Sequence, residues 1–315
     1  MMCENAVNAR VPVAVPGARG SSPLLKKVAG AVAATAALGA ATAAYGHFIE
    51  LNNFQLRTES LPVLPAGSPD FRILHISDMH MIPGQQKKID FMHSLAALEP
   101  DLVMNTGDNL SHVDGMGPLL EALDPLMDFP GVFVPGSNCY FAPVFKNPAR
   151  YLWQPRTPQM IEEGSRVALP IERMHDAFES RGWTGLINRY DTLSLKGLRL
   201  EFSGVDDPHL RYDEHPGFAP GAFDEGEEPS VRIGVAHAPY MRTLHRFVQD
   251  GAQAIFAGHT HGGQVCLPGG HALVSNCDLP PSRAKGVSEQ SGIPVQVSAG
   301  LGTSRFAPVR LFCPP

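Results

Sequence analysis

Residues 252–264 read AQAIFAGHTHGGQ, an apolar run followed by two histidines among glycines. The apolar part, residues 252–257, predicts a short buried strand. His259 and His261 lie two positions apart, so their side chains point the same way in an extended chain, and the glycines allow a sharp turn beside them. This pattern indicates either a metal site at a strand end or two solvated loop histidines. The rest of the chain has to decide between the two interpretations.

The first half of the chain repeats the same design of an apolar run that ends in polar side chains. Buried strands are expected at 72–77, 102–106 and 131–135, and helices at 89–98 and 113–127 between them. The order strand, helix, strand, helix, strand predicts an α/β unit with parallel strands.

The second half of the chain is expected to be richer in strands. A Pro- and aromatic-rich loop or cap is expected at 139–168. The elements that should follow are helices at 169–182 and 241–250 and strands at 191–195, 198–204, 231–237 and 294–299. Strands without intervening helices indicate an added sheet. We therefore expect two sheets packed face to face with the helices outside.

Each predicted parallel strand ends in side chains that can bind a metal. These candidate ligands are Asp78, His80, Asp108, Asn138, His237, His259 and His261. Taken singly, each is an ordinary turn or core residue. Together they follow five strand ends, and open α/β sheets bind their ligands at that edge.

The ligand types indicate which ions would be bound. Imidazoles mixed with carboxylates suit Mn, Fe, Zn or Ni better than Ca or Mg alone. Seven ligands are too many for one tetrahedral ion and suit two divalent ions. Two metals about 3.5–4 Å apart can hold a bridging hydroxide as nucleophile and stabilise the attacking and leaving oxygens of a phosphoryl group.

The order D-x-H, G-D, a G-N-type motif, H and G-H-x-H over residues 72–265 resembles the calcineurin-like metallophosphoesterase family. The segments GHTHGGQVCLPGG and SAGLGTSRFAPVR are similar to a branch of membrane-anchored bacterial phosphoesterases. The resemblance implies a four-layer α/β/β/α sandwich that hydrolyses phosphomonoesters or phosphodiesters. It also implies one metal on Asp78, His80 and His261, a bridging Asp108, and a second metal on Asn138, His237 and His259.

The chain departs from this family at the third motif. The family usually reads G-N-H-[DE], and its histidine helps to protonate the leaving group or to stabilise the transition state. Here residues 136–140 read GSNCY, so that histidine is missing. By location alone His112 and His209 are candidate substitutes, and either could equally be a surface histidine. Cys139 has no evident neighbouring base and is interpreted as a bystander.

One arginine is a candidate for substrate binding. Arg305 lies in the Gly-rich stretch 300–305. Its planar fork of donors would suit two phosphate oxygens. A loop arginine bonded to backbone is an equally good interpretation.

The N-terminal region predicts four segments. Residues 1–27 are basic and expected to be disordered, 28–49 form a candidate transmembrane anchor, 50–70 a linker or edge strand, and 71–315 the phosphoesterase domain. Residues 28–49 carry no formal charge and would span roughly 33 Å as a helix, against a bilayer core of about 30 Å. A signal peptide cleaved near the A-x-A site at 41–43 and a soluble Ala-rich helix are the alternatives.

The flanking charges predict the orientation of such an anchor. Lys26 and Lys27 precede the apolar segment, so the N-terminus would be cytoplasmic and the phosphoesterase domain would lie on the outer face of the membrane. A lipid-linked or envelope phosphate ester would then be within reach. The alternatives are a soluble or secreted phosphatase acting on nucleotides and a membrane-tethered metal-binding module with little or no turnover.

Composition excludes two further classes. A net charge of −6 without a long basic run argues against binding nucleic acid by phosphate neutralisation. The five cysteines form no C-x-x-C pair, which argues against a disulfide framework and against a cysteine-based zinc site. A single bridge between Cys266 and Cys277 is the one pairing we consider.

Overall fold

The computed structural model describes residues 23–144, 166–219 and 229–315. Residues 1–22 of the expected basic N-terminus and 145–165 of the expected cap lie outside the described residues. Residues 23–27, expected to be disordered, instead belong to the first helix. The chain divides after Ala43, and the second unit, Ala44–Pro315, contains every strand of the described chain.

The first described element is a long apolar helix, α1 (Pro23–Phe48). The helical span Lys26–Asn52 contains an 18-residue window with a mean hydropathy of 1.5. This helix is therefore long and apolar enough to serve as a membrane anchor or as a signal sequence.

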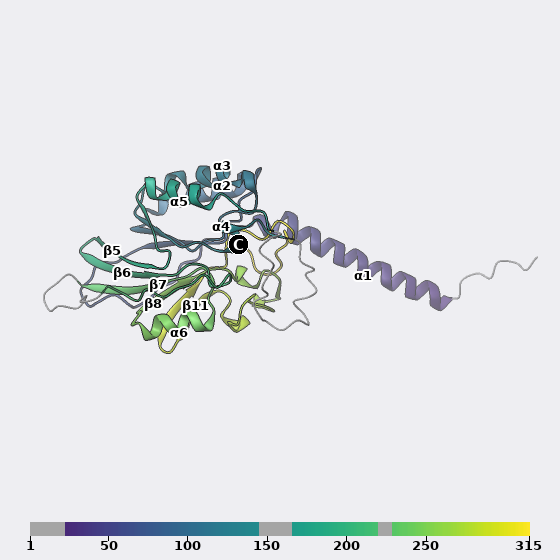
Figure 1. Cartoon of the computed structure of the whole chain (residues 1–315). Coiled ribbons are helices and arrows are strands. Elements are labelled where there is room, and N and C mark those ends of the chain that lie inside the picture. Colours follow the sequence, from purple (N-terminus) through teal and green to yellow (C-terminus); the bar gives the residue numbers. More distant parts are fainter. Residues whose placement is uncertain (1–22, 145–165, 220–228) are drawn as a thin grey trace, which may run out of the picture. The chain divides into compact units, whose positions relative to one another are not determined.

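The first sheet is parallel and has the strand order β1-β2-β3-β4. Its outer face is covered by α2, α3 and α5 (Figure 1). The helix expected at 113–127 is shorter than predicted, because Pro125 lacks the N–H that would continue it. The bounds are β1 (Ile73–Ile76), α2 (Gln86–Ser94), β2 (Leu102–Asn105), α3 (Met116–Leu123), β3 (Gly131–Phe133), α5 (Ile171–Ser180) and β4 (Trp183–Gly185).

The second sheet is mixed and has the order β11-β12-β8-β7-β6-β5. Its four central strands are parallel, and a hairpin closes each edge. α6 covers its outer face (Figure 1), and a short ribbon of β9 and β10 follows β8. The bounds are β5 (Arg189–Leu195), β6 (Leu198–Gly204), β7 (Ser230–Val235), α6 (Met241–Gln249), β8 (Ala254–Ala257), β9 (Cys266–Leu267), β10 (His271–Ala272), β11 (Gly286–Gln290) and β12 (Ile293–Val297).

The main core lies between the two sheets. Met104 and Val132 of the first sheet share one buried cluster with Phe202 and Ile233 of the second. Burial of such side chains from both inner faces is what holds the sheets together. The predicted four-layer α/β/β/α architecture is therefore confirmed.

The edge strand expected within 50–70 does not form. This segment contains the 3-10 helix Glu50–Asn52 and then runs on without pairing to a strand. Prolines at 62, 65 and 69 remove three of the N–H groups that a ladder would need. The segment instead packs Leu61, Val63 and Leu64 against the core between the sheets.

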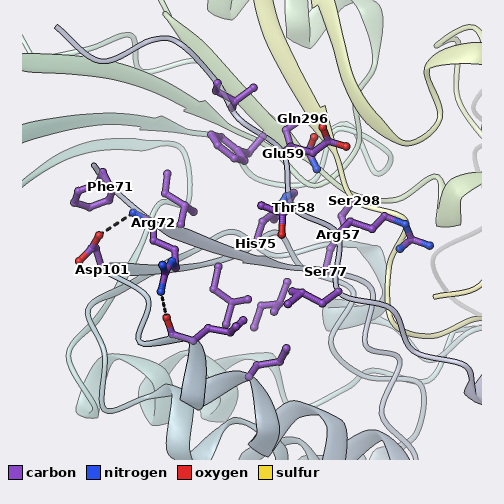
Figure 2. A pocket seen from close by; sticks show the side chains of 18 of the residues that line it. Arg57, Thr58, Glu59, Phe71, Arg72, His75, Ser77, Asp101, Gln296 and Ser298 are labelled. Carbon is purple, nitrogen blue, oxygen red and sulfur yellow. Dashed lines mark hydrogen bonds between the residues drawn. The ribbon is translucent and has the colours of Figure 1, made fainter. Parts of the chain in front are cut away.

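A cavity of about 910 Å³ lies between this segment and the β1 edge of the first sheet. Figure 2 shows His75 and Ser77 of the β1 region, Gln296 of β12 and residues 57–59 of the covering segment around it. Ser77 donates to Asp78 Oδ2 (2.6 Å), so the inner end of the cavity lies behind one of the candidate ligands.

One disulfide does form, but it joins Cys266 to Cys313 and not to Cys277, which remains a buried thiol. The C-terminal segment runs beside β9, where the Cys266 N–H donates to the Leu311 carbonyl oxygen (2.9 Å). The disulfide joins positions 47 residues apart, and neither the number nor the spacing of the cysteines reveals it.

Replacing both Cys266 and Cys313 by serine is expected to lower the free energy of unfolding by about 3–4 kcal/mol, because the open chain regains loop entropy when unfolded. Urea denaturation measures this loss. Reductant should shift the wild-type curve to the same midpoint and leave the double variant unchanged. Coinciding curves for wild type and variant under oxidising conditions would show that the bridge does not stabilise the fold.

Candidate metal centre

The seven candidate ligands come from five loops that follow five parallel strands. Three of these loops follow strands of the first sheet and two follow strands of the second. The two sheets present these carboxyl ends at one edge of the sandwich, where such folds bind ligands. Asp78 and His80 follow β1, Asp108 follows β2, and Asn138 follows β3 in the short helix α4 (Ser137–Tyr140). His237 follows β7, and His259 and His261 follow β8.

The ligand loops hold an unusual backbone conformation. Five of the seven candidates have a positive φ, between 47° and 70°, although none is a glycine. A left-handed conformation at such residues costs about 1–3 kcal/mol each and persists only where the surroundings impose it. The residues are Asp78, His80, Asp108, His259 and His261. Backbone strain concentrated at the candidate ligands indicates a functional site.

Glycines allow these loops to approach one another closely. A Cβ atom at Gly136 would lie 2.4 Å from Asp108 Oδ1, and one at Gly258 would lie 1.9 Å from Ser77 Oγ. Neither distance is compatible with a side chain. The glycines of the G-S-N and G-H-x-H motifs are therefore needed for packing of the centre as well as for turns.

The ligand atoms form two overlapping groups. In one, atoms of Asp78, His80 and His261 all lie within 4.8 Å of one another, and in the other the same holds for Asp78, Asp108 and His237. Asp108 lies between two histidines, with Oδ2 3.5 Å from His80 Nε2 and Oδ1 3.4 Å from His237 Nε2. This carboxylate therefore connects His237 of the second group with His80 of the first.

Backbone carbonyls determine which ring nitrogen is free on two of the histidines. His237 Nδ1 lies 2.7 Å from the Thr106 carbonyl oxygen, and His261 Nδ1 lies 3.0 Å from that of Gly302. A carbonyl only accepts, so each Nδ1 carries a proton and Nε2 is the nitrogen that remains to bind a metal. Hydrogen bonds of this kind orient metal-binding histidines.

The Nε2 atoms of His237 and His261 face imidazole nitrogens and carboxylate oxygens. His237 Nε2 lies 3.3 Å from His259 Nδ1 as well as close to Asp108. His261 Nε2 lies 3.3 Å from His80 Nε2 and 3.7 Å from Asp78 Oδ1. Nitrogen and carboxylate atoms that converge in this way are stabilised by positive charge between them, which a proton or a metal cation can supply. The donor set therefore fits metal cations.

Burial keeps three of the histidines neutral. It lowers the pKa of His80 and of His261 to about 3, and it lowers the pKa of His259 well below its usual range. Neutral imidazole is the form that binds a metal, so these rings need not lose a proton first.

The Asp108–His237 pair behaves differently. Burial alone would lower the pKa of His237, but the charge and hydrogen bond of Asp108 raise it to about 10. Burial alone would raise the pKa of Asp108. The charge and hydrogen bond of His237 outweigh burial and lower this pKa well below its usual range. A proton held by this pair supplies the positive charge that a metal would otherwise bring.

Asn138 lies against the same carboxylate. Its backbone N–H donates to Asp108 Oδ1 (2.7 Å), and its side-chain Nδ2 donates to Asp108 Oδ2 (2.8 Å). The Asn138 side chain is thus held against Asp108 through its amide nitrogen. The neighbouring Cys139 is buried, which raises the pKa of its thiol to about 12, and this agrees with its interpretation as a bystander.

Of the two candidate substitutes for the missing histidine, only His209 is shown in contact with a candidate ligand. Its ring centroid lies 4.7 Å from that of His259, and its Nδ1 lies 2.9 Å from the Tyr240 hydroxyl. His112 caps a 3-10 helix, where its Nδ1 accepts a hydrogen bond from the Asp114 N–H (3.1 Å). The distinction depends on tertiary contacts that the sequence does not contain.

Arg305, the predicted phosphate-binding residue, is exposed, and its guanidinium lies over the Phe306 ring at 4.7 Å. It lines a cavity of about 500 Å³ that His80 also lines. The structure thus places Arg305 near one edge of the centre without contact to a candidate ligand among the described residues.

The sequence analysis missed Arg310. This side chain is fully buried, and its guanidinium donates to five backbone carbonyl oxygens at 2.8–3.2 Å. Two of these belong to His261 and Gly302, so Arg310 ties a ligand to the carbonyl that orients it. Arg310 is the last residue of the segment SAGLGTSRFAPVR, which resembles a family motif, but nothing in that segment indicates that its side chain is buried.

Residues 71–263 match the family model described as calcineurin-like phosphoesterase, and the chain belongs to that family. The chain is 27% identical over 215 residues to the Bacillus subtilis (strain 168) protein named Uncharacterized protein YpbG. The match covers 67% of this chain and 69% of that protein.

Solved structures resemble this chain more distantly. The protein TT1561 of Thermus thermophilus has 12% identity and a TM-score of 0.39, with 74% of this chain and 91% of that chain covered. A dimetal phosphatase from Danio rerio has 10% identity and the same TM-score of 0.39, covering 74% and 88%. Similarity at this level says nothing about the activity of this chain.

Proposed function

We propose that this chain is a two-metal hydrolase of phosphate esters. Membership of the calcineurin-like phosphoesterase family supports metal-dependent hydrolysis of such esters. The observation that carries the two-metal proposal is that two ligand groups share Asp78, while Asp108 of the second group lies 3.5 Å from His80 of the first. The proposed activity includes the hydrolysis of both phosphomonoesters and phosphodiesters.

The donor atoms suggest how two ions would be held. We assign one ion to Asp78, His80 and His261, the other to Asn138, His237 and His259, and Asp108 to both. Imidazole and carboxylate donors suit Mn, Fe, Zn or Ni. When bound, such a pair supplies Lewis acidity to the phosphoryl oxygens and lowers the pKa of a water molecule.

The chain's own groups would position and protonate the reactants. The Thr106 and Gly302 carbonyls hold His237 and His261 in the tautomer that binds a metal. We propose His209 as the residue that protonates the leaving group, because its ring lies beside that of His259 and contacts the Tyr240 hydroxyl. His112 remains the second candidate.

A module that binds metal with little or no turnover is the alternative function. The observation that favours it is the absence of the family's catalytic histidine, near whose position this chain has Cys139. Burial and a raised pKa make this thiol unsuited to donate a proton to a substrate.

We also propose that α1 anchors the chain in a membrane with the phosphoesterase domain on the outer face. The Lys26-Lys27 pair before the apolar span supports this orientation. The Cys266–Cys313 disulfide supports it independently, because disulfides persist in oxidising compartments. This position would bring lipid-linked or envelope phosphate esters within reach.

Removal of metals provides the test. The purified chain is expected to hydrolyse p-nitrophenyl phosphate or bis-p-nitrophenyl phosphate, to lose nearly all of this activity after chelation, and to regain it with Mn, Fe, Zn or Ni. Metal analysis should find two ions per active chain. A chain that binds two ions and turns over neither ester would support the metal-binding module instead.

A further inference from the structure

The cavity of about 500 Å³ beside the candidate centre has no role in the chemistry proposed above. His80 and Gly302 form its inner end, and the Gly302 carbonyl oxygen is the group that orients His261. The cavity therefore reaches one edge of the centre. A substrate with its phosphate at the centre could extend the rest of its structure into this space.

The charges around the cavity favour an anion. None of its described lining residues is Asp or Glu, although the whole chain has 31 acidic residues and 25 basic ones. Lys87 and Arg305 line it with exposed side chains. Lys88 is buried in the wall, where its Nζ donates to the Met79 carbonyl oxygen (2.5 Å).

One wall of the cavity is apolar. Phe54 is held there by stacking on Phe91, with ring centroids 5.2 Å apart. Phe48 lines the same cavity and is 70% exposed, and its neighbour Ile49 is 59% exposed, so apolar surface continues from the cavity onto the helix. The apolar side chains that line the cavity are Phe48, Leu51, Phe54, Ile82 and Leu301.

Two of these apolar residues belong to the candidate membrane span. Phe48 ends α1, Leu51 follows it within the 3-10 helix Glu50–Asn52, and both lie inside the span Lys26–Asn52. Chain connectivity alone therefore keeps this wall next to the apolar helix. A ligand that enters the cavity at this wall would meet cationic groups and apolar groups together.

We propose that this amphipathic cavity binds the apolar chain of the substrate, so that the enzyme acts on phosphate esters that carry a long alkyl or acyl group. The inference rests on the proposed phosphoesterase function and adds a substrate class to it. The phosphate lies toward His80, and the apolar chain lies along Phe48 and Leu51.

Two synthetic diesters with one leaving group test this proposal. Methyl and octyl p-nitrophenyl phosphate differ only in the alkyl chain. In each, water adds to phosphorus and the bond to the nitrophenol oxygen breaks, which releases alkyl phosphate, nitrophenolate and a proton. The full-length, metal-loaded chain in a phosphatidylcholine nanodisc is assayed with both esters below the micelle concentration of the octyl compound.

We expect kcat/KM for the octyl ester to exceed that for the methyl ester by about tenfold or more, which corresponds to burial of about two methylene groups. In Phe48→Ser this octyl-to-methyl ratio should fall about threefold or more. Tyr45→Ser is the matched control, because Tyr45 is also exposed on α1 (46%) and does not line the cavity. The ratio is independent of metal loading and of the fraction of folded chain.

The outcomes separate the two proposals. A wild-type ratio below about two, or an equal fall in Phe48→Ser and Tyr45→Ser, would overturn the amphipathic cavity and leave the phosphoesterase intact. No hydrolysis of either ester or of p-nitrophenyl phosphate would overturn both. A hexadecyl ester embedded in the nanodisc distinguishes the source: its turnover indicates a membrane lipid, and turnover of the dissolved octyl ester alone indicates a soluble amphiphile.

Discussion

Asp108→Ala is expected to reduce kcat for p-nitrophenyl phosphate by about a thousandfold or more, which corresponds to about 4 kcal/mol of lost transition-state stabilisation. Asp108 is the carboxylate that lies within 3.5 Å of both His80 and His237. Its loss would leave the two candidate ions without their shared ligand. Metal analysis of the purified variant should therefore find no more than one ion per chain.

Asp108→Asn and Asp128→Asn make this experiment decisive. The first keeps the side-chain volume, so that a loss of turnover in both Asp108 variants is not a consequence of a buried gap. The second removes a carboxylate that is 74% exposed and pairs with Arg181 at the surface, and it should retain activity. Near-normal turnover and metal content in Asp108→Ala, or in His237→Ala, would show that the two-metal model is wrong.

Arg310→Met is expected to have the largest effect on stability. The variant leaves five buried carbonyl oxygens without their donor, including those of His261 and Gly302. Loss of one member of such a buried polar network costs about 3–5 kcal/mol. For a domain of this size we expect the Tm to fall by roughly 10 °C.

A second measurement separates positioning from stability. Well below the unfolding temperature, the affinity of Arg310→Met for metal should be about 10–100-fold weaker, as is typical when a group that orients a ligand is removed. Arg283→Met is the matched control, since this partly buried arginine bonds Ser288 and Gln290 instead of a ligand loop. A lower Tm with unchanged metal affinity would mean that Arg310 stabilises the chain without positioning His261.

Much of the fold could be predicted because it depends on local patterns. Apolar runs such as 102–106 and 252–257 indicate buried strands by their composition and length alone. The order of strands and helices then implies parallel pairing. Of the two alternatives for 50–70, a linker or an edge strand, the strand does not form, since the prolines lack the N–H groups that pairing would need.

The candidate ligands could be predicted for a related reason. Each one follows a strand directly, so its position at the carboxyl edge of a sheet depends on a few covalent bonds. Asp78 and His80 follow β1 in this way, and His259 and His261 follow β8. What could not be predicted is the left-handed backbone at these four residues, because the surrounding loops impose it.

The sequence by itself determined most of the strand pattern, the family, the candidate ligands and the apolar helix, since each depends on residues that are neighbours in the chain. Only the tertiary structure decided that Cys266 joins Cys313, that His209 lies beside His259, and that Arg310 holds the loop of His261. Each of these contacts joins residues that are far apart in the chain. Such contacts form when the sheets pack, and no local pattern encodes them.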